Sequence, residues 1–589
     1  MDSILEVLTK KFEAVFEKAS YDKSYATVGV SNRPDLCEFQ CNGAMSLAKL
    51  YKKKPLDIAL EVVEKLKEDR AFSKLEAVPP GFINMSLSNE FLSDYLQSMS
   101  KEEKFGINIT NKKDKIIVDY GGANIAKPLH VGHLRSAIIG ESIKRLGAYF
   151  GNEMIGDVHL GDWGLQMGLI IEQLKCDKPD LVYFDENYNS QYPKEAPFSL
   201  EELEEIYPKA SARSKEDKEF RDKAQENTLK LQSGYAPYIA IWEHIMRISK
   251  ADLKKNYDNL DVHFELWKGE SDVQKYIEDL CKDLEERKIA YISDGALVVD
   301  IGEEGDTKEL PPCIIRKSDG AALYATSDLA TLIEREMLYD PDAYIYVADK
   351  RQELHYTQFF RVARKANIVK PEHGLSFIGF GTMNGSDGKP FKTRDGGVMR
   401  LEHLITLVNE AVYKKIKDNR DIEDEEAKNI AATVGLAALK YGDLSNQAAK
   451  DYVFDIDRFT SFEGNTGPYI LYTIVRIKSI LAKYEESSDV KVDYSYLKPA
   501  IHESEKALGL ELSKFNYVLN NAWKEIAPHR ICQYIYSLSN LFNSFYHEVK
   551  ILSEEDEERK LSYLALILLT KSVLEDCIDI LAIKAPERM

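Results

Sequence analysis

Residues 119–136 read DYGGANIAKPLHVGHLRS and decide the fold class. The short apolar run at 115–118 before them is rich in β-branched residues, which is typical of a buried strand. Two glycines follow, and apolar residues then recur at helical spacing, at Leu134, Ile138, Ile139 and Leu146. A strand, a glycine-rich turn and a helix in this order predict a doubly wound sheet, in which nucleotides bind at the carboxyl ends of the strands.

Two histidines stand at the start of the predicted helix. His130 and His133 are three residues apart, so their side chains would lie together in the first turn, where backbone N–H groups and the dipole favour a phosphate. Gly132 has no side chain, so a flat base could approach the backbone there. A zinc pair and two surface histidines are the alternatives. Zinc needs three or four protein ligands, and neither a Cys-x-x-Cys motif nor a third nearby histidine occurs.

The thirteen residues 124–136, NIAKPLHVGHLRS, resemble the nucleotide signature of class I aminoacyl-tRNA synthetases, and in particular that of the arginyl-tRNA synthetases. The resemblance implies a multidomain α/β protein. Its parts would be an α+β N-terminal module, a Rossmann-like nucleotide-binding catalytic domain with insertions and a C-terminal α-helical bundle.

The composition is that of a large soluble protein. With 589 residues the chain is too long for one core, and its 44% hydrophobic and 30% charged residues are ordinary for a globular chain. A net charge of −20 argues weakly against nucleic acid, because an acidic enzyme can still carry a basic face. The apolar stretch 564–569 is too short to span a membrane, and the first residues carry acids that a targeting signal lacks. Seven dispersed cysteines are typical of reduced thiols, so we expect a cytoplasmic protein with no membrane and no DNA partner.

Three domains are expected, at 1–110, 111–455 and 456–589. The first would be a tRNA-contacting module joined by a lysine-rich linker. The second shows strand patterns at 115–119, 296–300, 323–326, 343–348 and 375–380, and a polar insertion at 175–226. The third has amphipathic helical runs at 468–484, 503–523, 530–549 and 558–582.

Three further matches concern tRNA. Residues 38–45 (EFQCNGAM) resemble the N-terminal domain of arginyl enzymes, which touches the outer corner of tRNA and makes Asn42 the implied contact. Residues 527–534 (APHRICQY) and 585–589 (APERM) resemble the anticodon-binding domain. By this resemblance Tyr534 and Met589 contact splayed bases. Without the resemblance, Asn42 would be interpreted as an ordinary loop residue. The aromatic residues at helical spacing near Tyr534 would be interpreted as part of the helical core.

The chemistry of the family requires positive charge around ATP. A carboxylate attacks the α-phosphate, and the protein positions the reactants and neutralises charge, with Mg²⁺ bridging the phosphates. Residues 388–397 (GKPFKTRDGG) stand where class I enzymes carry a mobile lysine loop, so Lys392 and Arg394 are the implied cations, although an ordinary hairpin would read the same. Lys127 occupies a position where many arginyl enzymes have a lysine. His130, Gly132, His133, His355 and Lys392 would then contact ATP.

A guanidinium needs carboxylates and neutral acceptors around it. Residues 323–330 (LYATSDLA) resemble the arginyl signature, in which Tyr324 and Asp328 line the substrate, and Asp119 could add a second carboxylate. Residues 348–355 (ADKRQELH) imply a contact from Gln352. Asn124 and His133 would hold the α-amino and carboxylate groups, and Gly122 and Ala123 would also contact arginine. Arginyl enzymes usually have Ser-Ser-Pro-Asn or Ser-Ala-Pro-Asn where this chain has GGAN, so Gly122 would act through its backbone.

The resemblance therefore implies an arginine–tRNA ligase that forms arginyl-adenylate from L-arginine and Mg-ATP and passes arginine to the 3′-terminal ribose of tRNA(Arg). Family members need bound tRNA for the first step. We expect a monomer with no tightly bound cofactor, no structural zinc and no metal ligand set. The alternatives are another class I synthetase, a non-catalytic tRNA-binding relative and, remotely, a metal-dependent hydrolase. Acids in the pocket disfavour a neutral amino acid.

Overall fold

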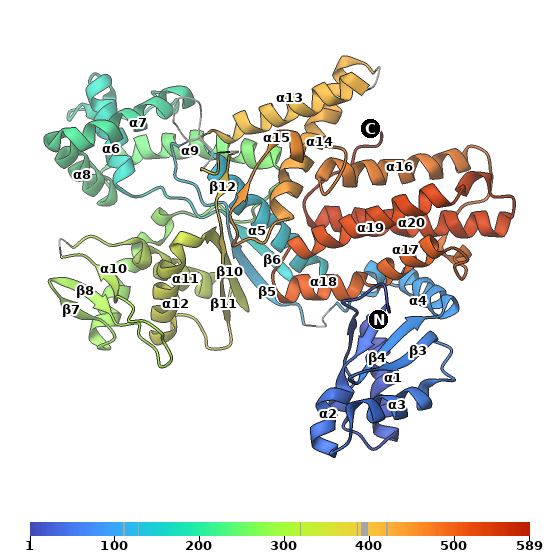
Figure 1. Ribbon diagram of the computed structural model, residues 1–589. Coiled ribbons are helices and arrows are strands. Elements are labelled where there is room, and N and C mark those ends of the chain that lie inside the picture. The colour runs from blue at the N-terminus through green and yellow to red at the C-terminus, as the bar shows by residue number, and fades with distance from the viewer. Residues whose placement is uncertain (110–111, 128, 319, 386, 390–398, 420–421) are drawn as a thin grey trace. The chain divides into compact units, whose positions relative to one another are not determined.

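The computed structural model describes the chain apart from residues 110–111, 128, 319, 386, 390–398 and 420–421 (Figure 1). The chain forms two compact units. Unit 1 holds residues 1–110, 415–445 and 458–589, and unit 2 holds residues 111–414 and 446–457. None of the described helices has both the length and the apolar content that crossing a bilayer requires.

Unit 2 is built on a four-stranded sheet with the order β11-β10-β5-β6. Its strands are β5 (Lys115–Asp119), β6 (Glu153–Asp157), β10 (Ala343–Asp349) and β11 (Gly374–Phe380). All three pairings are parallel, as short apolar β-branched runs joined by helical crossovers require. The predicted Rossmann-like sheet is confirmed.

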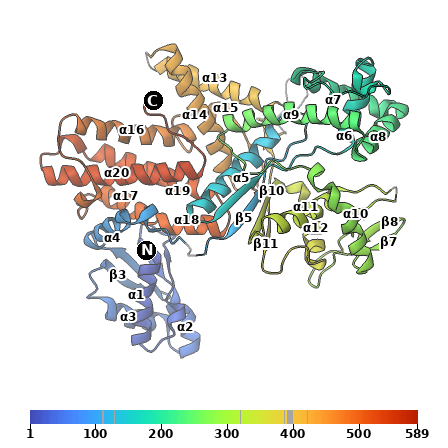
Figure 2. The same cartoon turned by 180° about the vertical axis from the view of Figure 1, so that it is seen from behind.

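Helices cover both faces of this sheet (Figure 2). Ile117, Tyr344 and Tyr346 pack in one core with α10 (Glu270–Glu286), α11 (Tyr324–Leu338) and α12 (Glu353–Lys365). On the other side lies α5 (Val131–Tyr149), which follows the signature. Ser136 fastens α5 to the sheet: its hydroxyl accepts from the Gly121 N–H at 2.8 Å and donates to the Val347 carbonyl at 2.7 Å.

The strand predicted at 323–326 is wrong, because Tyr324 begins α11. Leu323 is the N-cap, and its N–H donates to the Thr326 hydroxyl at 3.4 Å, so the β-branched residue serves a helix start. The prediction at 296–300 corresponds to β8 (Ala296–Val299), in an antiparallel sheet with the order β7-β8-β9. Its partners β7 (Tyr291–Ser293) and β9 (Cys313–Arg316), and also β6, were not predicted, since runs this short carry little periodicity.

The polar stretch at 175–226 lies in a helical insertion. It contains the end of α6 (Leu165–Asp177), all of η3 (Val182–Phe184) and α7 (Leu200–Glu216), and the first part of α8 (Lys218–Gln232). Helix α9 (Ala236–Asn259) follows. The small core of the insertion joins Leu169, Ala210, Phe220 and Ala224. Gly168 lets α6 and α8 touch, because a Cβ there would lie 2.0 Å from the Ala224 carbonyl oxygen.

Unit 2 is completed by short elements near the ends of the sheet strands. Strand β12 (Met383–Asn384) pairs in parallel with β13 (Tyr452–Val453). The remaining pieces are η4 (Lys350–Gln352) and α13 (Leu401–Asn419), whose last turns enter unit 1, together with the short α15 (Ile456–Phe459), which spans the boundary between the units.

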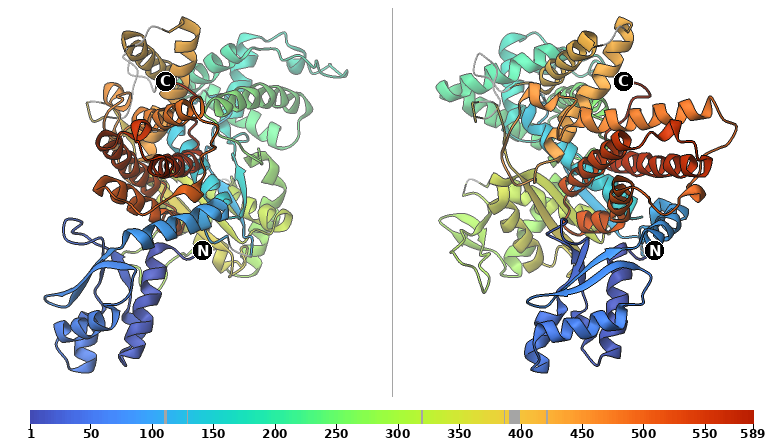
Figure 3. Two further views of the ribbon diagram at one scale, coloured as in Figure 1. Left: turned by 90° about the vertical axis from the view of Figure 1, so that its right-hand side faces the viewer. Right: turned by 45° about the vertical axis from the view of Figure 1, so that its right-hand side comes forward.

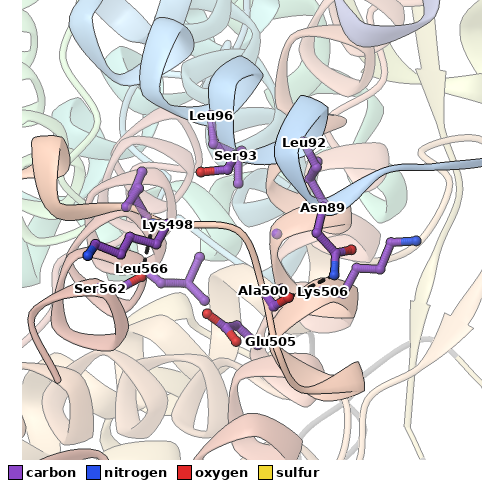
Figure 4. Close-up of a pocket in the computed structure, with 12 residues that line it drawn as sticks. Asn89, Leu92, Ser93, Leu96, Lys498, Ala500, Glu505, Lys506, Ser562 and Leu566 are labelled. Atoms are coloured by element: carbon purple, nitrogen blue, oxygen red, sulfur yellow. Dashed lines mark hydrogen bonds between the residues drawn. The ribbon is translucent and has the colours of Figure 1, made fainter. Parts of the chain in front are cut away.

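The N-terminal part of unit 1 is α+β, as predicted. An antiparallel sheet with the order β1-β2-β4-β3 is backed by helices. The elements are α1 (Ile4–Lys18), η1 (Lys23–Tyr25), β1 (Val28–Val30), β2 (Phe39–Cys41), α2 (Gly43–Tyr51), α3 (Pro55–Leu66), β3 (Phe72–Val78), β4 (Phe82–Leu87), α4 (Asn89–Lys101) and η2 (Glu103–Gly106). Helix α4 lies against the helical part of unit 1, where the Asn89 amide donates to the Ala500 carbonyl at 2.7 Å (Figure 4).

The rest of unit 1 is helical, in agreement with the predicted amphipathic runs (Figure 3). Its elements are α14 (Asp424–Leu444), α16 (Gly467–Glu485), η5 (Tyr494–Tyr496), α17 (Glu503–Ser513), α18 (Phe515–Lys524), α19 (His529–Glu548), η6 (Ile551–Ser553) and α20 (Glu557–Ile580). Helix α14, which precedes the expected boundary at 455, packs in this bundle as well. The Tyr441 hydroxyl donates to the Cys532 carbonyl at 3.0 Å.

Candidate active site

The two signature histidines cap the start of α5 reciprocally. The Gly132 N–H donates to His130 Nδ1 at 3.0 Å, and the His130 N–H donates to His133 Nδ1 at 3.1 Å. Because Nδ1 accepts on both rings, each neutral imidazole carries its proton on Nε2 and can donate it outward. A larger residue would not fit at position 132, because a Cβ there would lie 2.8 Å from His130 Cε1.

Both imidazoles are held neutral. Burial and then the neighbouring His130 lower the pKa of His133 to about 3. Burial and then Lys127 lower the pKa of His130 below its ordinary value. At neutral pH the pair therefore offers two uncharged N–H donors beside the positive end of the helix, which is an arrangement suited to phosphate oxygens.

The segment that follows residues 388–397 packs against the nucleotide signature. The Val131 N–H donates to the Met399 carbonyl at 3.1 Å, and the Leu401 N–H donates to the Leu129 carbonyl at 2.9 Å. The predicted cations Lys392 and Arg394 lie outside the described residues. Lys127 is described, and its ammonium rests 4.6 Å from the centre of the Tyr207 ring on α7.

The turn after β5 explains the departure from the family pattern. Gly121 has a φ of 71°, in the left-handed region, so a serine there would be strained. A Cβ on Gly122 would lie 2.9 Å from the His159 carbonyl oxygen, so this position also lacks room. Ala123 is buried and offers only its backbone, whereas Asn124 is exposed. Gly161 leaves space for Asn124, whose Oδ1 would lie 2.3 Å from a Cβ at 161.

Asp119 ends β5 as predicted, but it is already paired. The Arg335 guanidinium donates at 2.6 Å to both Asp119 and Asp157, and at 3.0 Å to the Tyr346 hydroxyl. Burial raises the pKa of Asp119, and the positive charge of Arg335 opposes this rise. Ligand atoms of Asp119, Asp157 and His159 lie within 4.8 Å of one another, as a metal would need. The Arg335 guanidinium already supplies the positive charge that a metal ion would bring to these carboxylates.

The predicted substrate residues on α11, Tyr324 and Asp328, lie near a further acid that the sequence did not reveal. Tyr324 is 72% exposed, and one turn later Asp328 Oδ2 lies 2.6 Å from His355 Nε2. Glu270, at the start of α10, belongs to the same site. Burial raises its pKa to about 7, His159 opposes the rise, and the charges of Asp162 and Asp328 add to it. Gln352 is exposed at the end of η4, before α12.

Glu270 reaches this place through tertiary pairing. Segment 266–270 lies beside 157–160, where Leu266 bridges Asp157 and Gly269 bridges Leu160. The Glu270 N–H donates to the Leu160 carbonyl at 3.1 Å. In the sequence Glu270 is an ordinary acid in the first turn of a helix, so no local signal distinguishes it.

Comparisons with known proteins identify the family of the chain. Residues 95–456 match the family model described as tRNA synthetases class I (R), catalytic domain. Residues 3–87 match the arginyl tRNA synthetase N terminal domain, and residues 470–589 match the DALR anticodon binding domain. The chain belongs to the class I arginyl-tRNA synthetases.

Full-length relatives support the assignment of this synthetase. It is 56% identical to an arginine–tRNA ligase of Agathobacter rectalis and 52% identical to one of Alkaliphilus oremlandii, with all of each chain covered. Its fold matches the crystal structure of the arginyl-tRNA synthetase from Plasmodium falciparum with a TM-score of 0.83 at 26% identity, covering 100% of both chains. The predicted family and fold class are confirmed.

The predicted tRNA contacts of the synthetase lie in unit 1. Asn42 is exposed at the N-cap of α2. Tyr534 is only 3% exposed, and its hydroxyl has no hydrogen-bond partner among the described residues. The prediction that Tyr534 meets a base is therefore wrong for this conformation, since the ring is core. Met589 is 8% exposed and lines a groove.

This groove of about 840 Å³ runs between α16, α20 and the C-terminal residues. The Arg476 guanidinium lies 4.6 Å from the ring centre of Tyr472 and 5.2 Å from that of Tyr546. Cations outnumber acids along it; the charged lining is Arg476, Lys478, Lys483, Lys571, Arg588, Glu485 and Glu587. Several of these cations are ion-paired: Lys478 with Glu575 and Glu587, and Lys571 with Glu575.

Proposed function

We propose that this synthetase activates L-arginine with ATP and transfers it to tRNA(Arg). Arginyl-adenylate and pyrophosphate form first, and the arginyl group then passes to the 3′-terminal ribose with release of AMP. One observation carries the choice of arginine: the pairing of segment 266–270 with 157–160 brings the carboxyl of Glu270 to the strand ends, where Asp328 on α11 adds a second carboxylate. The relatives named arginine–tRNA ligase support the same reaction.

In the activation step the substrate carboxylate attacks the α-phosphorus and pyrophosphate leaves. His130 and His133 would donate from Nε2 to phosphate oxygens, and the start of α5 adds its N–H groups. Neutral imidazoles suit this task, because their hydrogen bonds need no proton transfer as charge moves. ATP arrives as its magnesium complex, and the ion neutralises part of the triphosphate charge.

Selectivity for arginine would follow from burial. The guanidinium of arginine would form ion pairs with Glu270 and Asp328, which replace the contacts with water that these carboxylates lose on burial. Tyr324 and Gln352 would supply neutral oxygen acceptors. A neutral analogue such as citrulline brings no positive charge to these acids, which costs affinity at a site built to bind a cation. Asp119 contributes through its pair with Arg335 to the shape of the pocket.

For the second substrate, the groove of unit 1 between α16, α20 and the C-terminal residues is suited to a single-stranded loop. Its cations can neutralise phosphates, and Tyr472, Tyr546 and the guanidinium of Arg476 offer flat surfaces for bases. Asn42, exposed on the N-terminal module, is the proposed contact with another part of the tRNA. All seven cysteines are free thiols, which fits a cytoplasmic location. We propose that the protein is cytoplasmic and monomeric.

The test is ATP-dependent attachment of labelled arginine to tRNA, with lysine and citrulline as competitors. We expect arginine charging that falls at least a hundredfold in Asp328→Asn. The matched control is Asp340→Asn, because Asp340 is an exposed aspartate just beyond the same helix. Charging with another amino acid, or equal loss in both variants, would refute the assignment of the pocket.

A further inference from the structure

His355 lies where two helices of the candidate active site meet. It stands in the first turn of α12, three residues after Gln352, and α12 packs beside α11 on one face of the sheet (Figure 1). Its Nε2 lies 2.6 Å from Oδ2 of Asp328 on α11. The family resemblance implies that His355 contacts ATP, whereas this hydrogen bond joins it to a carboxylate of the proposed arginine subsite.

The hydrogen bond between the two side chains has a defined direction. A carboxylate can only accept, so Nε2 of His355 carries the proton and is the donor. Within the described part of the chain, the side chain of Asp328 has no other hydrogen bond or ion pair. Oδ1 of Asp328 and the second lone pair of Oδ2 are thus the acceptors that a substrate can use.

Packing holds the imidazole of His355 in place. Its ring centre lies 5.5 Å from that of Tyr356 and 5.3 Å from that of Phe359, and Phe359 is fully buried in the core between the helices and the sheet. The side chains of His355 and Asp328 are 28% and 27% exposed, so most of each is shielded from water. A donor that is fixed in this way restricts the rotation of the carboxylate that it contacts.

We propose that His355 is a positioning residue of the arginine subsite, which acts through Asp328 and orients its carboxylate for the guanidinium of the substrate. This inference rests on the proposed function. A guanidinium and a carboxylate form two parallel N–H···O bonds only when the two groups are aligned. A carboxylate that is already held in position loses less freedom when arginine binds, so the affinity for arginine is higher.

The test separates the N–H donor of His355 from its ring. His355→Phe keeps a ring that can pack against Phe359 but removes the donor, and His355→Gln keeps a side-chain N–H without the ring. The KM values for arginine and ATP and kcat are measured in the attachment of labelled arginine to tRNA, and the melting temperature is measured separately. We expect the KM for arginine to rise at least about tenfold in His355→Phe, as the loss of a hydrogen bond to a charged group implies, and less than about threefold in His355→Gln.

The two substrates should respond differently. The KM for ATP and kcat at saturating arginine should change by less than about twofold in both variants, because the lost interaction concerns the binding of arginine in the ground state. If His355 contacted ATP instead, the KM for ATP would rise and the KM for arginine would not.

A matched control lies on the same helix. His373 Nδ1 lies 3.0 Å from Oε1 of Glu336 on α11, and His373 directly precedes β11, at the edge of the sheet where the parallel strands begin. His373→Phe therefore removes a comparable pair of histidine and carboxylate at the edge opposite to the nucleotide signature. We expect both KM values to stay unchanged in this control, whatever its effect on the melting temperature.

An unchanged KM for arginine in His355→Phe would overturn the proposal, and so would an equal rise in His373→Phe. An equal loss in His355→Gln would also overturn it, because the ring rather than the donor would then matter. Equal losses for both substrates together with a lower melting temperature would make His355 a structural residue and refute the proposal as well. The proposed function fails separately, if the unsubstituted enzyme attaches no arginine to tRNA.

Discussion

The raised pKa of Glu270 predicts that this residue weakens the fold in order to bind substrate. Its pKa moves from 4.5 to about 7, with burial as the largest cause. A carboxyl whose pKa is higher in the folded state destabilises the fold fully above the folded pKa, and not at all below the unfolded value. The rise corresponds to about 3 kcal/mol, which appears as the pH increases from about 5 to about 8.

Glu270→Gln removes this penalty. The melting temperature of the variant should match that of the unsubstituted enzyme near pH 5 and exceed it by about 5 °C near pH 8, as about 3 kcal/mol implies for a large unit. The control is Asp279→Asn, an exposed acid on the same helix, which should behave alike at both pH values.

Activity should change in the opposite direction. A guanidinium needs the ionised carboxylate, so the KM for arginine of the unsubstituted enzyme should rise as the pH falls through about 7. In Glu270→Gln the KM should be high at every pH and nearly independent of it. A variant that is less stable at pH 8, or whose arginine KM keeps its pH dependence, would refute the reasoning.

Three further outcomes follow from single residues. His133→Ala should lower kcat for adenylate formation by about a hundredfold or more in pyrophosphate exchange, because it removes one donor to developing charge; a loss below tenfold would contradict that role. Gly121→Ala should reduce the free energy of unfolding by about 1–2 kcal/mol in urea, since its φ is 71°; an equal stability would argue against the left-handed turn. Arg476→Ala should weaken tRNA binding several-fold and reduce its salt dependence, whereas Tyr534→Phe should leave binding unchanged; binding assays at two salt concentrations decide both.

Local sequence patterns predicted those elements whose structure depends mainly on neighbouring residues. Residues 119–136 combine a strand, a turn and a helix start within one stretch, so the nucleotide signature and its two histidines could be placed from spacing alone. The long amphipathic runs after residue 456 predicted the bundle for the same reason. The run at 323–326 misled because four residues suit a strand or a first helical turn equally, and the Leu323 cap decided between them.

Tertiary structure decided which charges meet. Asp119 looked like a free carboxylate at the end of a strand, but α11 brings Arg335 to it from 216 residues away in the chain. Tyr534 carries the family motif, yet packing buries its ring at 3% exposure.

The sequence by itself determined the family, the sheet that binds the nucleotide and the order of the domains, because these depend on contiguous motifs and on periodicity. Only the tertiary structure decided that Glu270 lies at the strand ends beside the nucleotide signature. Its raised pKa comes from burial and from carboxylates that the pairing of distant segments brings together, because electrostatic energy depends on distance in space.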